Sequence, residues 1–499
     1  MINAPTSYAA AIYQGERNIE EVRIGNNKVW PTMGEPSIFQ LTLTSKLDID
    51  IYYTQTAPSS VLVNWGDGSE PGYTPALNAH LHHRYYEPGD YELQLTSRKG
   101  CTWSPGAVDQ NDSTINYGFL GSYGSTKDGT TPELTGFALS KEARLDVPYA
   151  FYGCTGLTSA SVPAFISSTS DYIFEACSGL TEISLPDSMQ TIAWGLLFDC
   201  SALVEITLPC NLSSISGHAF RGTGIRTIDI PSTVTSIGEN AFAYCTDLEA
   251  FYFPPLVTAI ANDVLRNCTS LSVVTIPEGV VSIGSQAFFL CSSLSSLSLP
   301  ASLTNIYGDN NTDGNMICFQ RSGITNFHVA EENPAFCDVD GVLYTKDRST
   351  LLVYPPARQG AYTVPRKVTV HYHAFYYCVG LTKITLSTGV VLAGAGDGHT
   401  FGASAFQFCT ALIEADLGLT TIYGHVFQNC TALEKVWLRS TCTTITASAV
   451  SQSPFYTTNK NCVLYVAASS KPSGFGSYWD NYDGSTKLSV VYRQTTSPF

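Results

Sequence analysis

The chain has 499 residues, with 26 Lys and Arg against 42 Asp and Glu, for a formal net charge of −16. This length exceeds one ordinary hydrophobic core and predicts at least two structural units. The acidic balance argues against a nucleic-acid partner, because binding to phosphates requires clustered basic residues.

Residues 1–15 lack the basic region and continuous apolar core of a secretory signal peptide, and no run of about 20 apolar residues predicts a membrane-spanning helix. We therefore expect no such signal and no membrane insertion. The composition, with 44% hydrophobic and 14% charged residues, is that of a folded chain.

Residues 1–33 predict short strands separated by Gly and Asn turns. The string Ile12-Tyr13-x-Gly15, Ile19, Val22, Ile24-Gly25 and Lys28-Val29-Trp30 resembles an N-terminal module of bacteriophage tail and virion proteins from gut bacteria. The resemblance implies an attachment module that contacts other virion structural proteins. A small β-hairpin cap is the alternative.

Residues 34–100 predict a β-sandwich, with strands at 38–44, 47–53, 61–65 and 91–96. The segments Val63-Asn64-Trp65-Gly66-Asp67-Gly68-Ser69 and His83–Tyr91 resemble a PKD domain, which implies a spacer or weak binding module. We expect Trp65 to pack between the sheets. A metal site at His80, His82 and His83 is disfavoured, because alternate strand residues face opposite sides.

Residues 101–145 are rich in Gly, Ser, Thr and Asp and predict a linker or an N-terminal cap for the repeats that begin at residue 146. Asp109, Asn111 and Asp112 could bind a cation, although solvated loop residues are the better explanation.

Residues 146–446 repeat one phrase, Ala-Phe-x-x-Cys-x-x-Leu, with a common step of 23 residues. A fixed period of this length predicts a stacked solenoid. An alternating apolar pair after each Leu predicts a short half-buried strand, and a proline ends most of these strands. Thr223 and Ser322 replace the cysteine in two shortened copies.

The pattern AFxxCxxLxxIxLP resembles the leucine-rich repeats of bacterial surface antigens of the BspA type, and residues 340–355 resemble a variant repeat of those arrays. The expected fold is therefore mainly β with short helical turns, a leucine-rich-repeat solenoid preceded by a PKD-like β-sandwich. From Cys462 the chain resembles the closing module of such arrays, and residues 447–499 are expected to cap the last repeat.

Nine cysteines share one phase of the repeat and are expected to be buried free thiols; some disulfide bridging is the alternative. They are Cys154, Cys177, Cys200, Cys245, Cys268, Cys291, Cys378, Cys409 and Cys430. Cys101, Cys210, Cys318, Cys337, Cys442 and Cys462 are out of phase and remain unassigned. No C-x2-C pair indicates a metal site.

Two copies carry eight extra residues in the segment that returns to the next repeat, and these insertions are candidate binding loops. They contain Asp309, Asn311, Asp313, Asp397 and His399. Neutral drift in a tolerant loop is the alternative. Asp309–Gly314 also matches the first half of an EF-hand loop, but Gln320 stands where a bidentate Glu is required. We therefore expect no cofactor, with calcium as the alternative.

One outward strand position recurs in every repeat and could bind carbohydrate or protein, with Tyr252, His328 and Trp437 as candidate binding residues. A solvated face of hydroxyl residues is the alternative. The column consists of Ser184, Thr207, Asp229, Tyr252, Thr275, Ser298, His328, Thr385, Asp416 and Trp437.

The sequence contains no G-x-S-x-G elbow, Walker loop, H-E-x-x-H motif or dinucleotide fingerprint, and we expect no catalytic residues. His218, His373 and His425 share a phase that indicates a polar turn position. A polysaccharide-degrading enzyme has no residue set to support it.

Two function classes remain. The first is a non-enzymatic receptor-binding protein on a bacteriophage virion, such as a tail or head fibre. The second is a secreted BspA-like adhesin, extracellular or on the bacterial surface. In both, the expected partner is a host cell-surface protein or glycan, and a homo-oligomer is compatible with either. The absent signal peptide and the N-terminal resemblance favour the first class.

Overall fold

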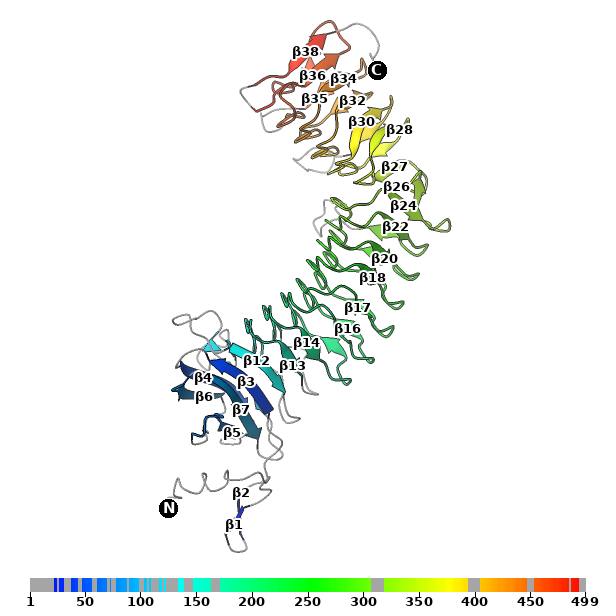
Figure 1. The fold of residues 1–499 in the computed structure, drawn as a ribbon. Coiled ribbons are helices and arrows are strands. Elements are labelled where there is room, and N and C mark those ends of the chain that lie inside the picture. Colours follow the sequence, from blue (N-terminus) through cyan, green and yellow to red (C-terminus); the bar gives the residue numbers. More distant parts are fainter. Residues whose placement is uncertain are drawn as a thin grey trace. The chain divides into compact units, whose positions relative to one another are not determined.

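The computed structural model describes residues 22–24, 27–30, 37–43, 47–55, 61–69, 72, 78–87, 89–97, 103–105, 107–108, 116–118, 121–122, 133–138, 147–162, 171–306, 318–393, 404–446, 453–483 and 486–492. The chain divides into two compact units, unit 1 (Met1–Thr246) and unit 2 (Asp247–Phe499). Every regular element within the described ranges is a β-strand (Figure 1). The prediction of short helical turns is therefore wrong.

A rung is one repeat of the solenoid, and two left-handed residues in most of the described rungs explain why the turns are not helical. Tyr149 and Gly153 lie two residues before and after Phe151 and have φ angles of 59° and 68°. L-residues in this region interrupt a right-handed helix. The Phe151 and Gly153 amides instead donate to carbonyl oxygens of the next rung, Ile173 O at 2.9 Å and Glu175 O at 2.8 Å. Equivalent pairs of positive φ angles bracket Phe174, Phe220 and Phe242.

The strands that precede the repeats form four sheets in unit 1. β1 pairs with β2, β9 to β11 form a small sheet, β6-β4-β8 form another, and β3, β5, β7 and β12 belong to a fourth. Their bounds are β1 (Val22–Ile24), β2 (Asn27–Trp30), β3 (Ser37–Leu43), β4 (Leu47–Gln55), β5 (Val61–Asn64), β6 (Asn78–Tyr85), β7 (Gly89–Ser97), β8 (Trp103–Pro105), β9 (Ala107–Val108), β10 (Asn116–Gly118), β11 (Gly121–Ser122) and β12 (Glu133–Ala138). The four strands predicted between residues 38 and 96 are confirmed, and β6 contains His80, His82 and His83, which were expected on a strand of unstated bounds.

The fourth sheet continues without a break into the solenoid, in the order β14-β13-β12-β3-β7-β5. β12 pairs antiparallel with β3 and parallel with β13, so that Phe137 lies opposite both Phe39 and Ala160. The Phe137 ring centroid is 5.9 Å from Phe39 and 4.4 Å from Phe151, a core residue of the first rung. Residues 133–138, expected in a linker or cap, therefore form the strand that joins the two parts into one core.

The rungs of unit 1 place apolar residues inward at a constant register. Ile192, Ile215 and Ile237 lie opposite one another in neighbouring parallel strands and are 0–4% exposed. The named strands of these rungs are β13 (Ser159–Ser161), β14 (Glu182–Ser184), β15 (Thr191–Ile192), β16 (Ser214–Ile215) and β17 (Ser236–Ile237).

Unit 2 is also built of rungs and, in its described residues, contains the antiparallel interruption β25-β26-β27, which includes part of the variant repeat at 340–355. Its strands are β18 (Ala250–Tyr252), β19 (Ala259–Ile260), β20 (Val273–Thr275), β21 (Ser282–Ile283), β22 (Ser296–Leu299), β23 (Asn305–Ile306), β24 (Asn326–Val329), β25 (Phe336–Val339), β26 (Val342–Thr345), β27 (Thr350–Val353), β28 (Gly360–Val364), β29 (Thr369–Val370), β30 (Leu381–Leu386), β31 (Val391–Leu392), β32 (Glu414–Leu417), β33 (Thr421–Ile422), β34 (Lys435–Leu438), β35 (Thr444–Ile445), β36 (Val463–Val466), β37 (Gly474–Phe475) and β38 (Ser489–Tyr492).

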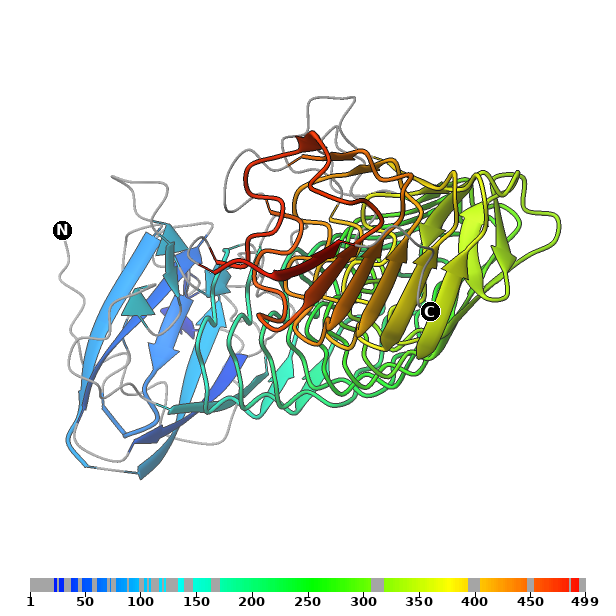
Figure 2. The ribbon, with the colours of Figure 1, turned by 90° about the horizontal axis from the view of Figure 1, so that it is seen from above.

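The segment expected to cap the array continues its sheet. β36 and β38 extend the parallel order β28-β30-β32-β34-β36-β38, whose strands lie side by side in Figure 2. Phe455 stacks on Phe427 with a centroid distance of 5.8 Å. The Thr458 hydroxyl donates to Phe455 O, as Thr223 does to Phe220 O. Thr458 therefore occupies the cysteine position of a further rung.

The in-phase cysteines form a column of hydrogen-bonded thiols. The Cys177 thiol donates to Phe151 O at 3.0 Å, and Cys200 donates to Phe174 O at 3.1 Å. The described cysteines are free, and the in-phase thiols are buried except that of Cys154, which is half-buried. The prediction of buried free thiols is thus confirmed. Burial raises the pKa of the Cys200 and Cys291 thiols to about 12, which suppresses the reactive thiolate.

A thiol-reactive dye should accordingly label the native protein at few sites. Of the described cysteines, only Cys210 is exposed, while Cys154 and Cys337 are half-buried. We expect about one rapidly reacting thiol among the 14 described cysteines of the native protein, and all 15 cysteines of the chain to react after denaturation. Cys210→Ser should remove the rapid phase, as measured by absorbance of the released dye. Rapid labelling of several thiols that survives Cys210→Ser would contradict the buried column.

Candidate functional site

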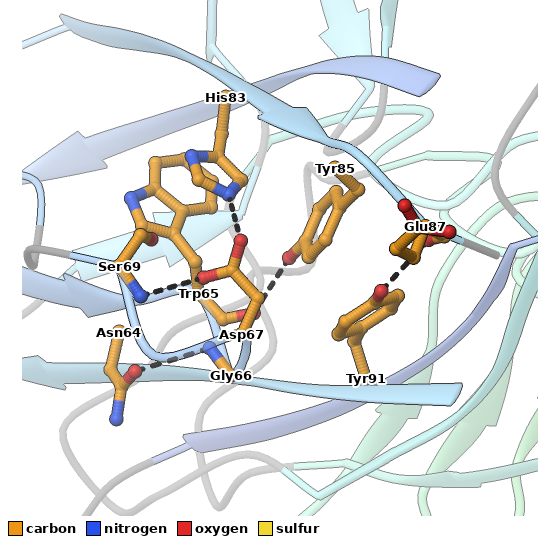
Figure 3. A network of polar contacts seen from close by, with 9 residues as sticks. All are labelled: Asn64, Trp65, Gly66, Asp67, Ser69, His83, Tyr85, Glu87 and Tyr91. Atoms are coloured by element: carbon orange, nitrogen blue, oxygen red, sulfur yellow. Dashed lines mark hydrogen bonds and ion pairs between the residues drawn. The ribbon is translucent and has the colours of Figure 1, made fainter. Parts of the chain in front are cut away.

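A network of polar contacts at the end of β5 includes the Asp67 carboxylate and the His83 imidazole. These contacts stabilise the local turn and the packing of two sheets. The Trp65 ring is 3% exposed and stacks on His83 of β6 with a centroid distance of 4.5 Å (Figure 3). His83 Nε2 lies 2.8 Å from Asp67 Oδ2, and the Tyr85 hydroxyl donates to Trp65 O at 2.7 Å. Trp65 therefore bridges two sheets, as predicted.

Asp67 also accepts the Ser69 amide at 3.0 Å, which closes the turn. Although partial burial raises the pKa of Asp67, hydrogen bonds from Ser69 and His83 hold it below its usual value. The carboxylate and imidazole are thus engaged with each other and with the turn.

Gly66 is required at this turn for two reasons, its φ of 81° and its close approach to β7. A Cβ at Gly66 would lie 2.4 Å from Glu92 O, whereas a Cβ at Gly68, with φ 82°, would meet no heavy atom within 4 Å. We expect Gly66→Ala to lower the free energy of unfolding by about 3 kcal/mol and Gly68→Ala by about 1 kcal/mol. Urea-induced unfolding of the full chain measures both. Equal losses of unfolding free energy in the two variants would show that the close approach of a Cβ at position 66 to Glu92 O does not destabilise the protein.

The outward side of three rungs in unit 1, of which only β14 forms a strand there, is hollowed into an open groove of about 720 Å³, called here the unit 1 groove. Carboxylates and hydroxyls dominate its lining, and no Lys or Arg side chain contributes to it. The lining residues are Thr181, Glu182, Ile183, Ser184, Leu185, Asp187, Glu205, Ile206, Thr207, Leu208, Pro209, Thr227 and Asp229.

Like charges follow one another along this groove. Glu182 and Glu205 are both exposed and are separated by one 23-residue step, so they occupy the same position in successive rungs. Within the described ranges neither makes an ion pair. Glu182 lies in β14 and Glu205 in an irregular segment of the next rung, and like charges at equivalent positions of neighbouring rungs repel each other.

The corresponding face of unit 2 balances its charges. Lys383, Glu414 and Lys435 lie opposite one another on β30, β32 and β34. Glu414 contacts the two ammonium groups at 3.0 Å and 3.3 Å. Although burial raises the pKa of Glu414, these groups hold it below its usual value. The alternation of signs in unit 2 contrasts with the single sign in the unit 1 groove.

Tyr252 and His328 lie at exposed positions of one column in unit 2. Tyr252 is 57% exposed and lies opposite Thr275. His328 is exposed and lies opposite Ser298. Between them the column presents the hydroxyls of Thr275 and Ser298.

Trp437 was expected to be exposed, and this expectation is wrong. Its side chain is 1% exposed and lies opposite Asp416 and Tyr465. The Tyr465 ring is 5.7 Å away, and Arg439 holds Asp416 through two hydrogen bonds of 2.8 Å and 2.6 Å. At the Trp437 end of the column, the side chains therefore pack against one another, whereas at Tyr252 and His328 they are exposed to solvent.

The other predicted binding residues, Asp309, Asn311, Asp313, Asp397 and His399, lie outside the described residues. Gln320 is 1% exposed and its side-chain oxygen accepts the Phe319 amide at 3.1 Å. Across the described ranges, no three His, Cys, Asp or Glu side chains are arranged to hold a metal ion.

Glu182, Asp187 and Glu205 were not among the predicted binding residues, because the predicted column contains a single outward position of each strand. The signal was present, since Glu182 and Glu205 recur at the 23-residue step. A strand of three residues presents two outward side chains, and both columns contribute to the groove.

Among the described residues, no helix has the length and apolar character needed to cross a membrane. Residues 133–249, 235–332 and 362–462 match a family profile described as BspA type leucine rich repeat region, in six copies. These ranges cover more than half of the chain.

Several solved structures are similar. A leucine-rich repeat protein from Bacteroides ovatus is 23% identical, with a TM-score of 0.46, over 74% of this chain and 97% of that chain. A leucine rich cell surface protein from Faecalibacterium prausnitzii is 23% identical, with a TM-score of 0.47, over 77% and 98%. The pneumococcal vaccine antigen PcpA is 16% identical, with a TM-score of 0.40, over 78% and 99%. No curated protein matches the chain.

Proposed function

Because the chain belongs to the BspA-type leucine-rich repeat family, we propose that it is a non-enzymatic surface adhesin that binds its partner through the exposed strand faces of its rungs. The observation that carries this proposal is the unit 1 groove, whose carboxylates face solvent without ionic partners in the described ranges. A surface that keeps repulsive charges unbalanced is expected to be a binding surface, since a bound cationic group relieves the repulsion.

The partner we propose is a host cell-surface protein or glycan. Carboxylates of the groove would attract cationic groups, and the hydroxyls of Thr181, Ser184 and Thr207 would accept and donate hydrogen bonds. Each contact is weak, and several copies of the chain on one surface would raise the apparent affinity. In unit 2 we propose Tyr252 and His328 as further contacts; the inserted residues Asp309, Asn311, Asp313, Asp397 and His399 remain proposals from sequence.

We also propose roles for the parts of the chain: attachment for residues 1–33, a PKD-like module for 34–100, a link and cap for 101–145, the display solenoid for 146–446 and closure for 447–499. The PKD-like assignment is supported by the Trp65–Ser69 turn and the Tyr91 hydroxyl, which donates to Glu87 O at 2.8 Å. The sheet shared by β3, β12 and β13 favours a capping role for this module.

A second candidate is a virion fibre protein of a bacteriophage, located on the virion surface and possessing the same adhesive rungs. Its support is the N-terminal sequence resemblance, within which β1 and β2 form an antiparallel hairpin. Immunogold labelling with an antibody against residues 146–446 separates the two. Labelled bacterial envelopes support the adhesin, and labelled particles support the virion protein.

Attachment of the fluorescent full-length chain to cultured epithelial cells tests the groove. We expect the triple variant Glu182→Gln, Glu205→Gln and Asp229→Asn to bind at least tenfold less, because the charges that attract the partner are removed. The matched control is Asp247→Asn, Glu331→Gln and Glu332→Gln, which alters the net charge equally at exposed positions outside the groove. The control should bind within twofold of the parent chain.

Equal losses in both triple variants would mean that attachment depends only on net charge, and no loss in either would remove the groove from consideration. Tyr252→Ala with His328→Ala, and deletion of residues 308–315 and 393–399, test the remaining candidate contacts in the same assay.

A further inference from the structure

A cluster of imidazole and phenol rings surrounds the turn at Phe375 in unit 2. The His371 ring lies 4.3 Å from that of Tyr372, and the Tyr372 ring lies 4.7 Å from that of His373. The His373 ring is 4.9 Å from that of Tyr376. The two imidazoles are thus half-buried among aromatic rings and share one neighbour.

The surroundings of these imidazoles oppose a positive charge. Nδ1 of His371 and of His373 is buried and has no hydrogen-bond partner in the described part of the chain. The Arg321 guanidinium lies 4.8 Å from the ring centroid of Tyr377 in the same turn. The titratable groups packed around the turn, from its own and the preceding rung, are Tyr372, Tyr376, Tyr377, Tyr354 and Tyr362. No carboxylate is recorded against either imidazole within the described residues.

The charge state follows from this environment. Burial lowers the pKa of His371 to about 4. Burial, together with the neighbouring His371, lowers the pKa of His373 to about 4. Unfolded histidine has a pKa near 6.5. The closed turn therefore binds fewer protons than an open one, and its stability is present above pH 6.5 and is lost as the pH falls from about 6.5 to 4.

The backbone hydrogen bonds that opening of the turn must break run to both neighbouring rungs. The His371 amide donates to Leu351 O of the preceding rung at 2.9 Å. The Phe375 and Tyr377 amides donate to Ala405 O and Gln407 O of the following rung, both at 3.0 Å. Local opening of such a segment costs less than unfolding the whole unit.

We propose that residues 371–377 form an acid-sensitive turn, in which protonation of His371 and His373 opens the turn and exposes its aromatic rings while the other rungs remain folded. Opening hydrates both imidazolium groups and separates them from each other. The surface presented by unit 2 thereby changes between neutral and mildly acidic surroundings. This device is independent of the partner proposed above.

Hydrogen–deuterium exchange of the full-length chain, corrected for the intrinsic pH dependence of exchange, tests the proposal. With folded pKa values of about 4, lowering the pH from 7 to 5 favours opening by about 20-fold for each histidine. We expect protection of residues 371–378 to fall more than 100-fold. The equivalent turn at 284–291, which carries Gln286 and no histidine, should change less than threefold.

The double variant His371→Phe and His373→Phe retains ring volume and should abolish the pH dependence, whereas His328→Gln, at an exposed strand position, should leave it unchanged. Histidine NMR titration of the unaltered chain gives a second reading that needs no variant. Titration of two histidines near pH 4 supports the proposal. Ordinary titration of every histidine, or equal loss of protection in both turns, would overturn it.

Discussion

Replacing Phe137 with alanine is expected to lower the free energy of unfolding by about 3–5 kcal/mol and to weaken the N-terminal sheets and the first rungs together. The Phe137 ring is 6% exposed and packs against Phe39, Phe151 and Phe174, with centroid distances of 5.9, 4.4 and 6.0 Å. These rings belong to both parts of unit 1, so the cavity left by alanine adjoins both. Urea-induced unfolding measures the loss.

Hydrogen–deuterium exchange locates the effect. Protection in residues 37–43 and 157–162 should fall in parallel in Phe137→Ala, because β3 and β13 lie on either side of β12. Phe137→Leu is the matched control, since a change that preserves most of the apolar volume costs less than about 1.5 kcal/mol. A loss confined to one of the two segments would mean that the N-terminal sheets form an independent domain.

Asn333→Ala is expected to lower the free energy of unfolding of unit 2 by about 3–5 kcal/mol. Asn333 is 0% exposed. Its Nδ2 donates to Pro300 O and Leu303 O, both at 2.8 Å. Its Oδ1 accepts the amides of Ala335 at 2.9 Å and Phe336 at 2.8 Å. Alanine leaves these four backbone groups without that partner, and thermal unfolding followed by circular dichroism reports the cost.

The matched control for this variant is Asn326→Ala. Asn326 is exposed, and its Nδ2 donates to Thr325 Oγ1 at 3.2 Å. An exposed hydrogen bond of this kind contributes little, so the change should stay within about 0.5 kcal/mol. A similar effect of the two alanine variants would contradict the role assigned to Asn333.

The parts of the fold that repeat could be predicted from the sequence. A period of 23 residues places Phe and Cys inward wherever they recur, and the inward positions of Phe174, Cys177 and Leu180 are indeed 0% exposed. The strands between residues 38 and 96 follow from alternation alone. Local pattern suffices for these elements, since each rung repeats the same environment.

The features that were missed depend on contacts between distant residues. The turns were expected to be helical, because Tyr149 and Tyr172 carry no signal for a positive φ, which L-residues seldom adopt. The joining strand β12 pairs with β3, nearly 100 residues earlier in the chain. Trp437 is buried by packing that includes Tyr465 on the next strand, and no periodicity of one strand reports such a neighbour.

The hydrogen-bonded thiol column has a consequence for how such a chain can change its length. The Cys177 thiol donates to Phe151 O, and the Cys200 thiol donates to Phe174 O. Each rung therefore donates one thiol hydrogen bond to the preceding rung and accepts an equivalent one from the following rung. A tandem duplication of one complete repeat would therefore find matching partners on both sides. Gain or loss of whole repeats by unequal recombination should be tolerated, and related genes are expected to differ by multiples of this segment.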